Sequence, residues 1–257
     1  MSIYVEDINL WRLPATHPLD KRELLLDFTH RFSYDTTFTG SGRPAILFGL
    51  DGFSISSFGF TYGITDRFFG GIYRVPTALG RSIEMYGGAQ LAQESKGQPF
   101  SSTARIAAEG VNHFTENYVT SLELAFAKSL KQQAQIYFVP TGSFNDRPMM
   151  DAFGDLPPRP GVTTTALGAG LSLNIRPSVA FITEGNQRVS GRLGVHRPAF
   201  MFGIQKKVFR HSFTLGVTNS PGTTLSQRSA TRASLRGSPD DTFSGLTLGF
   251  NLSRRLF

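Results

Sequence analysis

Apolar and polar side chains alternate over many segments of about ten residues along this chain. In residues 24–34, Leu26 and Phe28 fall on one face and Asp27 on the other, and residues 165–175 repeat the pattern. A period of two is typical of β-strands whose two faces meet different surroundings, because successive side chains point to opposite sides. Helical spacing is rare, so we expect an all-β fold.

The alternation predicts about twelve strands, an even number, as bacterial membrane barrels require. The connections alternate between short and long, which places tight turns at one end and long loops at the other. We therefore predict a single up-and-down antiparallel transmembrane β-barrel. The alternative is a soluble β-protein, such as a lipocalin-like barrel, whose aromatic residues form an ordinary core. The strands are expected near residues 24–34, 52–62, 67–75, 82–93, 102–112, 117–128, 133–140, 164–175, 178–185, 198–208, 211–218 and 244–254.

Composition excludes several other classes of protein. Only 18% of the residues are charged, Phe and Gly are abundant, and no stretch of ~18 apolar residues predicts a transmembrane helix. Because Cys is absent, a disulfide framework, a thiol enzyme and c-type haem attachment are excluded. The first residues show no basic region followed by an apolar one, so we expect a bacterial outer-membrane protein whose secretory signal is not part of this sequence.

Several short motifs, taken in order, carry a family resemblance. Residues 60–67 read Phe-Thr-Tyr-Gly-Ile-Thr-Asp-Arg, and residues 249–254 read Gly-Phe-Asn-Leu-Ser-Arg. Between them lie His211-Ser212-Phe213-Thr214-Leu215 and Thr218-Asn219-Ser220, and Gly49-Leu50-Asp51-Gly52 precedes the set. From about residue 20 onward, the chain resembles a domain-of-unknown-function family of bacterial outer-membrane β-barrel proteins. The resemblance implies fold and location, and it carries over no activity and no catalytic residues.

If the apolar faces meet lipid, the opposite faces line the lumen and bring ionisable side chains there. Charges enclosed by a narrow barrel must be paired or hydrated. A barrel of about twelve strands lies between the packed eight-stranded barrels and the aqueous sixteen-stranded porins. The interior is therefore either a small-solute pathway selected by charge or an inert network of mixed sign. The candidate lumen residues are Asp27, Arg31, Arg74, Glu84, Arg105, Glu109, Glu123, Glu184 and Lys207.

Residues 176–210 carry most of the formal net charge of +7. Within them, the expected extracellular loop 186–197 holds Arg188, Arg192 and Arg197. A field of one sign concentrates anions, so this loop either binds lipopolysaccharide, an anionic solute or an acidic partner, or is simply a solvated basic loop. Nucleic-acid binding is not expected, because no basic groove with interleaved aromatic residues is apparent.

Residues 1–23 form an N-terminal arm that precedes the barrel at residues 24–257. The arm can lie in the periplasm, enter the lumen as a plug, or dock on another envelope protein, and a lone exposed Trp11 favours docking. The Pro-rich loop 141–163 either folds over the mouth, offers a partner surface or is a stiff exposed loop. The loop 219–243 is expected to be mobile.

Motifs for chemistry are sparse, so we expect no enzyme, no metal site and no cofactor. The relevant comparison is the outer-membrane phospholipase, to which the chain is similar only in expected strand number. Such an enzyme needs a Ser nucleophile beside a His. His30 falls on the lipid-facing side of its strand, but no motif places a Ser or Asn beside it.

The function that the sequence favours is a narrow porin-like channel for small, anionic solutes. The alternative is a non-conducting barrel that anchors or scaffolds a larger cell-envelope complex through its loops and N-terminal arm. In both cases outer-membrane lipid and lipopolysaccharide are the expected surroundings, with other envelope proteins as partners in the second.

Overall fold

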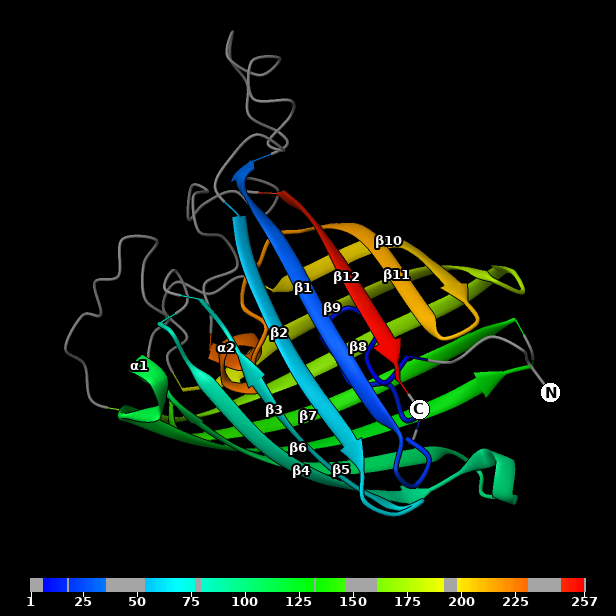
Figure 1. The fold of residues 1–257 in the computed structure, drawn as a ribbon, viewed down its shortest axis with the longest axis horizontal. Helices are drawn as coiled ribbons and strands as arrows, with labels where there is room; N and C mark the ends of the chain where they lie inside the picture. Colours follow the sequence, from blue (N-terminus) through cyan, green and yellow to red (C-terminus); the bar gives the residue numbers. More distant parts are fainter. Residues whose placement is uncertain are drawn as a thin grey trace, which may run out of the picture.

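Twelve strands close into a barrel in the computed structural model, which describes residues 7–17, 19–35, 54–76, 80–131, 133–146, 161–191, 198–230 and 246–256 (Figure 1). Each strand pairs antiparallel with its neighbours in the chain, and β1 pairs with β12 to close the sheet. This confirms the predicted all-β, up-and-down barrel. The strands are β1 (Leu24–Asp35), β2 (Ser54–Gly63), β3 (Phe68–Arg74), β4 (Ile83–Ala92), β5 (Ser101–Gly110), β6 (Glu116–Leu130), β7 (Ala134–Asp146), β8 (Val162–Arg176), β9 (Val179–Ser190), β10 (Ala199–Val208), β11 (His211–Thr218) and β12 (Thr247–Arg255).

The two ends of the barrel differ in how they connect the strands. Tight turns join β2 to β3, β6 to β7, β8 to β9 and β10 to β11, and the 3-10 helix η3 (Glu94–Lys96) joins β4 to β5. We call this the short-turn end, and Leu256 N–H donates to the carbonyl oxygen of Leu24 there at 2.8 Å. At the opposite, long-loop end, α1 (Val111–Phe114) joins β5 to β6, and α2 (Leu225–Ala230) lies between β11 and β12.

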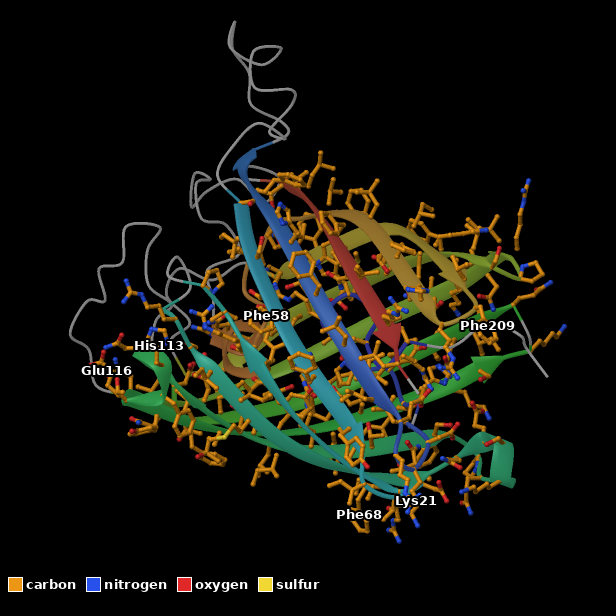
Figure 2. The ribbon with its side chains drawn as sticks, in the orientation of Figure 1. Lys21, Phe58, Phe68, His113, Glu116 and Phe209 are labelled. Atoms are coloured by element: carbon orange, nitrogen blue, oxygen red, sulfur yellow. The ribbon has the colours of Figure 1, made fainter. Side chains whose placement is uncertain are left out.

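Large apolar side chains cover the outer face of the barrel. Phe58, Phe68 and Phe209 are labelled in Figure 2 and are 42%, 50% and 70% exposed. A water-soluble protein rarely exposes an apolar surface of this extent, whereas a lipid-facing strand alternates apolar residues outside with polar residues inside. Among the residues that the structure describes, no helix is long and apolar enough to cross a membrane. Other large apolar side chains on this face are Ile72, Ile106, Leu122, Leu124, Phe138, Leu167, Phe202 and Leu215.

Strand β7 continues past Pro140 to Asp146, although the sequence pattern predicted its end at residue 140. A Pro interrupts a central ladder because it lacks the N–H donor. The ladder to β6 is indeed interrupted opposite Pro140, but the ladder to β8 keeps Pro140 paired with Leu167. The predicted loop 141–163 is therefore shorter than expected, and its residues 147–160 lie outside the described part of the chain.

Candidate functional site

The N-terminal segment, residues 7–17, lies inside the barrel. It folds as a tight turn, because Leu10 N–H donates to the carbonyl oxygen of Leu13 at 2.9 Å and Ala15 N–H donates to that of Ile8 at 2.8 Å. Trp11 is 2% exposed and Leu13 is 1% exposed. Burial of each such side chain contributes about 1.5–3 kcal/mol. The expectation of an exposed Trp11 available for docking is therefore wrong in this structure.

Small residues in the wall make room for the segment. A Cβ atom at Gly168 of β8 would lie 2.7 Å from Leu13 Cδ2, and one at Gly170 would lie 2.5 Å from Leu10 Cδ1. Both separations are shorter than packed carbon atoms allow, so a larger residue at either position must displace the segment. The apolar surface around it is completed by Ala125, Ala127, Tyr137, Val139, Ala180, Ile182 and Met201.

Glu184 on β9 binds the backbone of this turn. Its Oε2 atom accepts hydrogen bonds from the N–H groups of Trp11, Arg12 and Leu13, at 3.2, 3.1 and 2.9 Å. Consecutive N–H groups that converge in this way form an anion-binding concavity. Hydrogen bonds to a charged acceptor are roughly twice as strong as neutral ones, so Glu184 is the main polar attachment of the segment.

Arg31 on β1 covers the face of the Trp11 ring. Its Cζ atom lies 3.8 Å from the ring centroid, which is a cation–π contact, and the side chain is buried. Nη1 donates to the carbonyl oxygens of His30 and Phe250 at 3.0 and 3.1 Å. Nε and Nη2 are buried and have no hydrogen-bond partner among the residues that the structure describes, so the guanidinium keeps unused donors.

A second segment, residues 219–228, fills the lumen from the long-loop end. Glu84 of β4 accepts a hydrogen bond from Leu225 N–H at 2.6 Å. Glu109 of β5 accepts one from the Thr224 hydroxyl at 2.8 Å and another from the Ser226 hydroxyl. This part of the predicted mobile loop 219–243 is thus buried against the wall, which corrects the expectation, and residues 231–243 lie outside the described chain.

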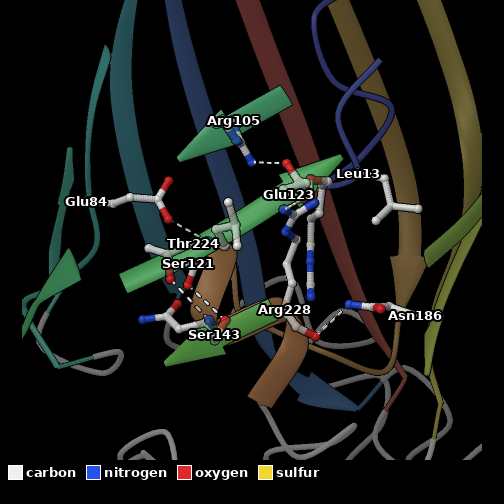
Figure 3. A network of polar contacts seen from close by, with 12 residues as sticks. Leu13, Glu84, Arg105, Ser121, Glu123, Ser143, Asn186, Thr224 and Arg228 are labelled. Carbon is white, nitrogen blue, oxygen red and sulfur yellow. Dashed lines mark hydrogen bonds and ion pairs between the residues drawn. The ribbon is translucent and has the colours of Figure 1, made fainter. Parts of the chain in front are cut away.

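The two filling segments also bind each other. Glu123 of β6 pairs with Arg105 of β5 at 2.8 Å through Oε1 and with Arg228 of α2 through Oε2 (Figure 3). Arg228 also donates to the carbonyl oxygen of Arg12. In return, Arg12 Nη1 donates to the carbonyl and hydroxyl oxygens of Ser220 at 3.1 and 2.9 Å. Arg228, which is paired with the wall carboxylate of Glu123, therefore connects α2 to the N-terminal segment.

Two small cavities lie beside these segments among the residues that the structure describes. One cavity of about 20 Å³ is lined by residues that include Tyr86 and Arg105, and another of about 10 Å³ by residues that include Arg12 and Glu184. Each volume is close to that of one water molecule. A larger hollow of about 820 Å³ is lined by residues of β3 to β9, among them the exposed Ile106 and the inner-face residues Arg105 and Glu123.

The sequence-predicted lumen residues lie on the inner face with one exception. The prediction that Arg74 faces the lumen is wrong. Its chain neighbour Tyr73 points inward, where its hydroxyl oxygen shares a hydrogen bond of 2.6 Å with Thr29 Oγ1. Arg74 pairs in register with the exposed Phe58 and shares its outward direction. The residues on the inner face are Asp27, Arg31, Glu84, Arg105, Glu109, Glu123, Glu184 and Lys207.

The predicted basic loop begins later than expected. Arg188 is a buried, inward-facing residue of β9, because that strand extends to Ser190 instead of ending near residue 185. Its assignment to an extracellular loop is therefore wrong. Arg192 and Arg197 lie outside the described residues.

Sequence reasoning missed several side chains of the filled lumen. Alternation along the strands contains the signal for Tyr73 and Tyr86, whose hydroxyls contact Thr29 and Thr61. It contains none for Arg12 and Arg228, since both lie in segments without periodicity. In the described ranges, no group of three or more His, Asp or Glu side chains is arranged to hold a metal ion.

Comparison with known proteins places the chain among membrane barrels. The sequence profile of a family described as membrane bound beta barrel domain (DUF5777) matches residues 6–256. The NanC porin structure is similar with a TM-score of 0.52 and 8% identity, covering 91% of this chain and 100% of the porin chain. The COG4313 outer membrane channel from Pseudomonas putida F1 is similar with a TM-score of 0.50 and 13% identity, covering 98% and 100%. Comparison with curated protein sequences found no match. At these identities the structural likeness shows the fold alone.

Proposed function

This chain belongs to the DUF5777 family of membrane-bound β-barrel domains, and from that premise we propose that it is a gated channel for small solutes in a bacterial outer membrane. The closed antiparallel barrel, with tight turns at one end, supports this location. In that orientation the short-turn end faces the periplasm and the long-loop end faces outward. The printed names of the two similar structures, a porin and an outer membrane channel, are consistent with transport.

The observation that carries the proposal is that a terminal segment outside every strand ladder fills the lumen. Residues 7–17 are attached through the Glu184 carboxylate, the Arg31 guanidinium and apolar packing. Their withdrawal toward the periplasm breaks no hydrogen bond between strands. The barrel wall therefore persists while this segment leaves, and full opening also requires residues 219–228 to move away from Glu84 and Glu109.

Charge inside the opened barrel sets the solute class. When Trp11 leaves, Arg31 regains an open guanidinium face and keeps its two unused donors. Arg105 stays paired with Glu123, whereas Glu184 loses its three N–H donors and becomes a free carboxylate. We propose small anions as the preferred solutes, with Arg31 as their binding group and with a modest preference because Glu184 opposes it.

The test is single-channel current through the full chain refolded into planar bilayers under a salt gradient. We expect discrete current steps and a reversal potential on the anion side. Arg31→Gln shifts that potential toward the cation side, whereas the matched variant Arg74→Gln, on the outer face, leaves it unchanged. A folded, inserted barrel that carries no current, with or without displacement of the N-terminal segment, contradicts the proposal.

A scaffold function is the second candidate, and the filled lumen favours it. Polar contacts from Glu84, Glu109, Glu123 and Glu184 hold both filling segments, which an inert barrel core would also require. A barrel of this kind carries no current and is recovered from membranes with envelope proteins in fixed stoichiometry. Zero conductance together with such partners selects this function over the channel.

A further inference from the structure

An imidazole and a hydroxyl meet on the outer face of the barrel. His30 of β1 and Ser56 of β2 are directly opposite in register, and Ser56 Oγ lies 2.8 Å from His30 Nδ1. Their chain neighbours Thr29 and Ile55 are buried on the inner face, so both His30 and Ser56 face lipid. Strand pairing thus supplies the Ser beside His30 that no sequence motif indicated.

Aromatic rings fix the imidazole of His30. It stacks on Phe250 of β12 with centroids 4.9 Å apart and an interplanar angle of 13°. Phe32 packs edge-on at 4.7 Å, and Phe28 lies 6.2 Å away. These ring contacts restrict the orientation of the imidazole whose Nδ1 atom lies beside Ser56 Oγ. Nδ1 in its unprotonated form accepts the hydroxyl proton, which is the arrangement that activates a Ser nucleophile.

Arg74 gives the same outer surface a positive charge. It pairs in register with Phe58 of β2, which lies two residues from Ser56 on the same face. Arg74 is therefore a diagonal neighbour of Ser56 across the ladder, a distance that long side chains bridge. It ends β3 at the long-loop end, where a long cationic side chain reaches the lipid headgroups. Guanidinium binds phosphate through paired N–H donors.

The backbone beside Ser56 has an edge outside the neighbouring ladder. Pairing between β2 and β3 begins at Phe58 and Arg74, so residues 54–57 precede it. A nucleophile, a base and a cation therefore lie together on the outer face, beside a part of β2 that precedes its ladder with β3.

We propose that Ser56 and His30 form a catalytic pair that hydrolyses an acyl ester of a phosphate-bearing membrane lipid, with Arg74 binding the phosphate. His30 Nδ1 takes the hydroxyl proton while Ser56 Oγ bonds to the ester carbonyl carbon. The ester C–O bond then breaks, and the leaving alcohol takes the proton from His30. Water, deprotonated by His30, next attacks the acyl-Ser56 ester and releases a fatty acid. The site lies outside the lumen and does not depend on the proposed channel.

The experiment uses the full chain refolded into vesicles, with a fluorophosphonate probe and two lipid esters. The probe is expected to label Ser56, located by peptide mass spectrometry. Fatty-acid release is measured from phosphatidylglycerol vesicles and, separately, from lipid A vesicles, because both carry phosphate and acyl esters. The vesicle type from which fatty acid is released identifies the lipid that serves as substrate.

Variants separate catalysis from folding. Ser56→Ala and His30→Asn are expected to lower labelling and fatty-acid release at least about a hundredfold, the lower end of the range for loss of a general base. Ser57→Ala, which faces the lumen, and His211→Asn, whose ring stacks on Phe213, are matched controls that keep both activities. Arg74→Gln raises KM and leaves probe labelling intact. A folded barrel that shows no labelling of Ser56, or labelling without fatty-acid release in either arm, overturns the proposal.

Discussion

The inner and outer faces of the same strands differ in what satisfies their side chains. Outside, large apolar residues such as Phe58 and Ile106 stand exposed to lipid and need no specific partner. Inside, Glu84, Glu123 and Glu184 each bind a particular group of another segment. The outer face therefore tolerates exchange of one apolar residue for another, whereas the inner face depends on what fills the barrel.

The largest effect is expected from a wall glycine that admits the N-terminal segment. Gly168→Leu places side-chain atoms where Leu13 lies, since even a Cβ atom would be 2.7 Å from Leu13 Cδ2. Overpacking costs about 1–3 kcal/mol. This corresponds to roughly a tenfold gain in the fraction of barrels whose N-terminal segment has left the lumen. Ala169→Leu adds the same side chain one residue along, on the outer face, and leaves the current unchanged. Equal currents from both variants would contradict the proposed difference between the inner and outer faces.

A smaller effect is expected when the carboxylate that holds the turn loses its charge. Glu184→Gln keeps the size but weakens three hydrogen bonds to backbone N–H groups. Loss of charge assistance costs about 1 kcal/mol, since bonds to charged groups contribute more than neutral ones. Trp11 is the sole tryptophan, so its quenching by acrylamide reports the segment directly and is expected to rise. Gln187→Ala on β9 is the control, and unchanged quenching in Glu184→Gln contradicts the assignment.

Alternation of side chains was sufficient to predict the wall of the barrel. It fixed the strand number, the topology and the inward direction of residues such as Glu109 and Lys207, because one buried face per strand leaves a period of two. It failed for Arg74, where the parity was assigned wrongly near a strand end. It also failed for β7, because the second ladder of Pro140 sustains the strand.

Periodicity could not predict the two segments that fill the barrel. The N-terminal segment and residues 219–228 have no repeating pattern, and their positions follow from contacts distant in sequence, such as Arg12 with Ser220. The pairing of His30 with Ser56 likewise depends on strand register. The sequence alone does not determine the register of these two strands, because the long connection between them allows several alignments.

The smallest effect is expected at the short-turn end, where charges meet water. Burial alone would raise the pKa of Glu94, but hydrogen bonds from Lys128 and Ser129 outweigh it and hold the pKa below its usual value. A carboxyl group whose pKa is lower in the folded state than in the unfolded state stabilises the fold at pH values above its unfolded pKa. That contribution is lost as the pH falls through its folded pKa. Glu94→Gln therefore lowers stability at neutral pH by about 0.2–1 kcal/mol and has no effect in acid. Denaturant unfolding at neutral and acid pH measures this loss of stability, with Glu116→Gln as the control variant. A loss of stability in Glu94→Gln that persists in acid contradicts the prediction.

The central claim is that the N-terminal segment must leave the lumen for current to flow. The chain has no Cys, so Leu13→Cys combined with Gly168→Cys introduces one pair across the contact between segment and wall. The decisive measurement is bilayer current through this double variant before and after a reductant is added. The account predicts no current while the pair is cross-linked and channel steps once it is reduced. Equal current in both states would show that the segment is not the gate.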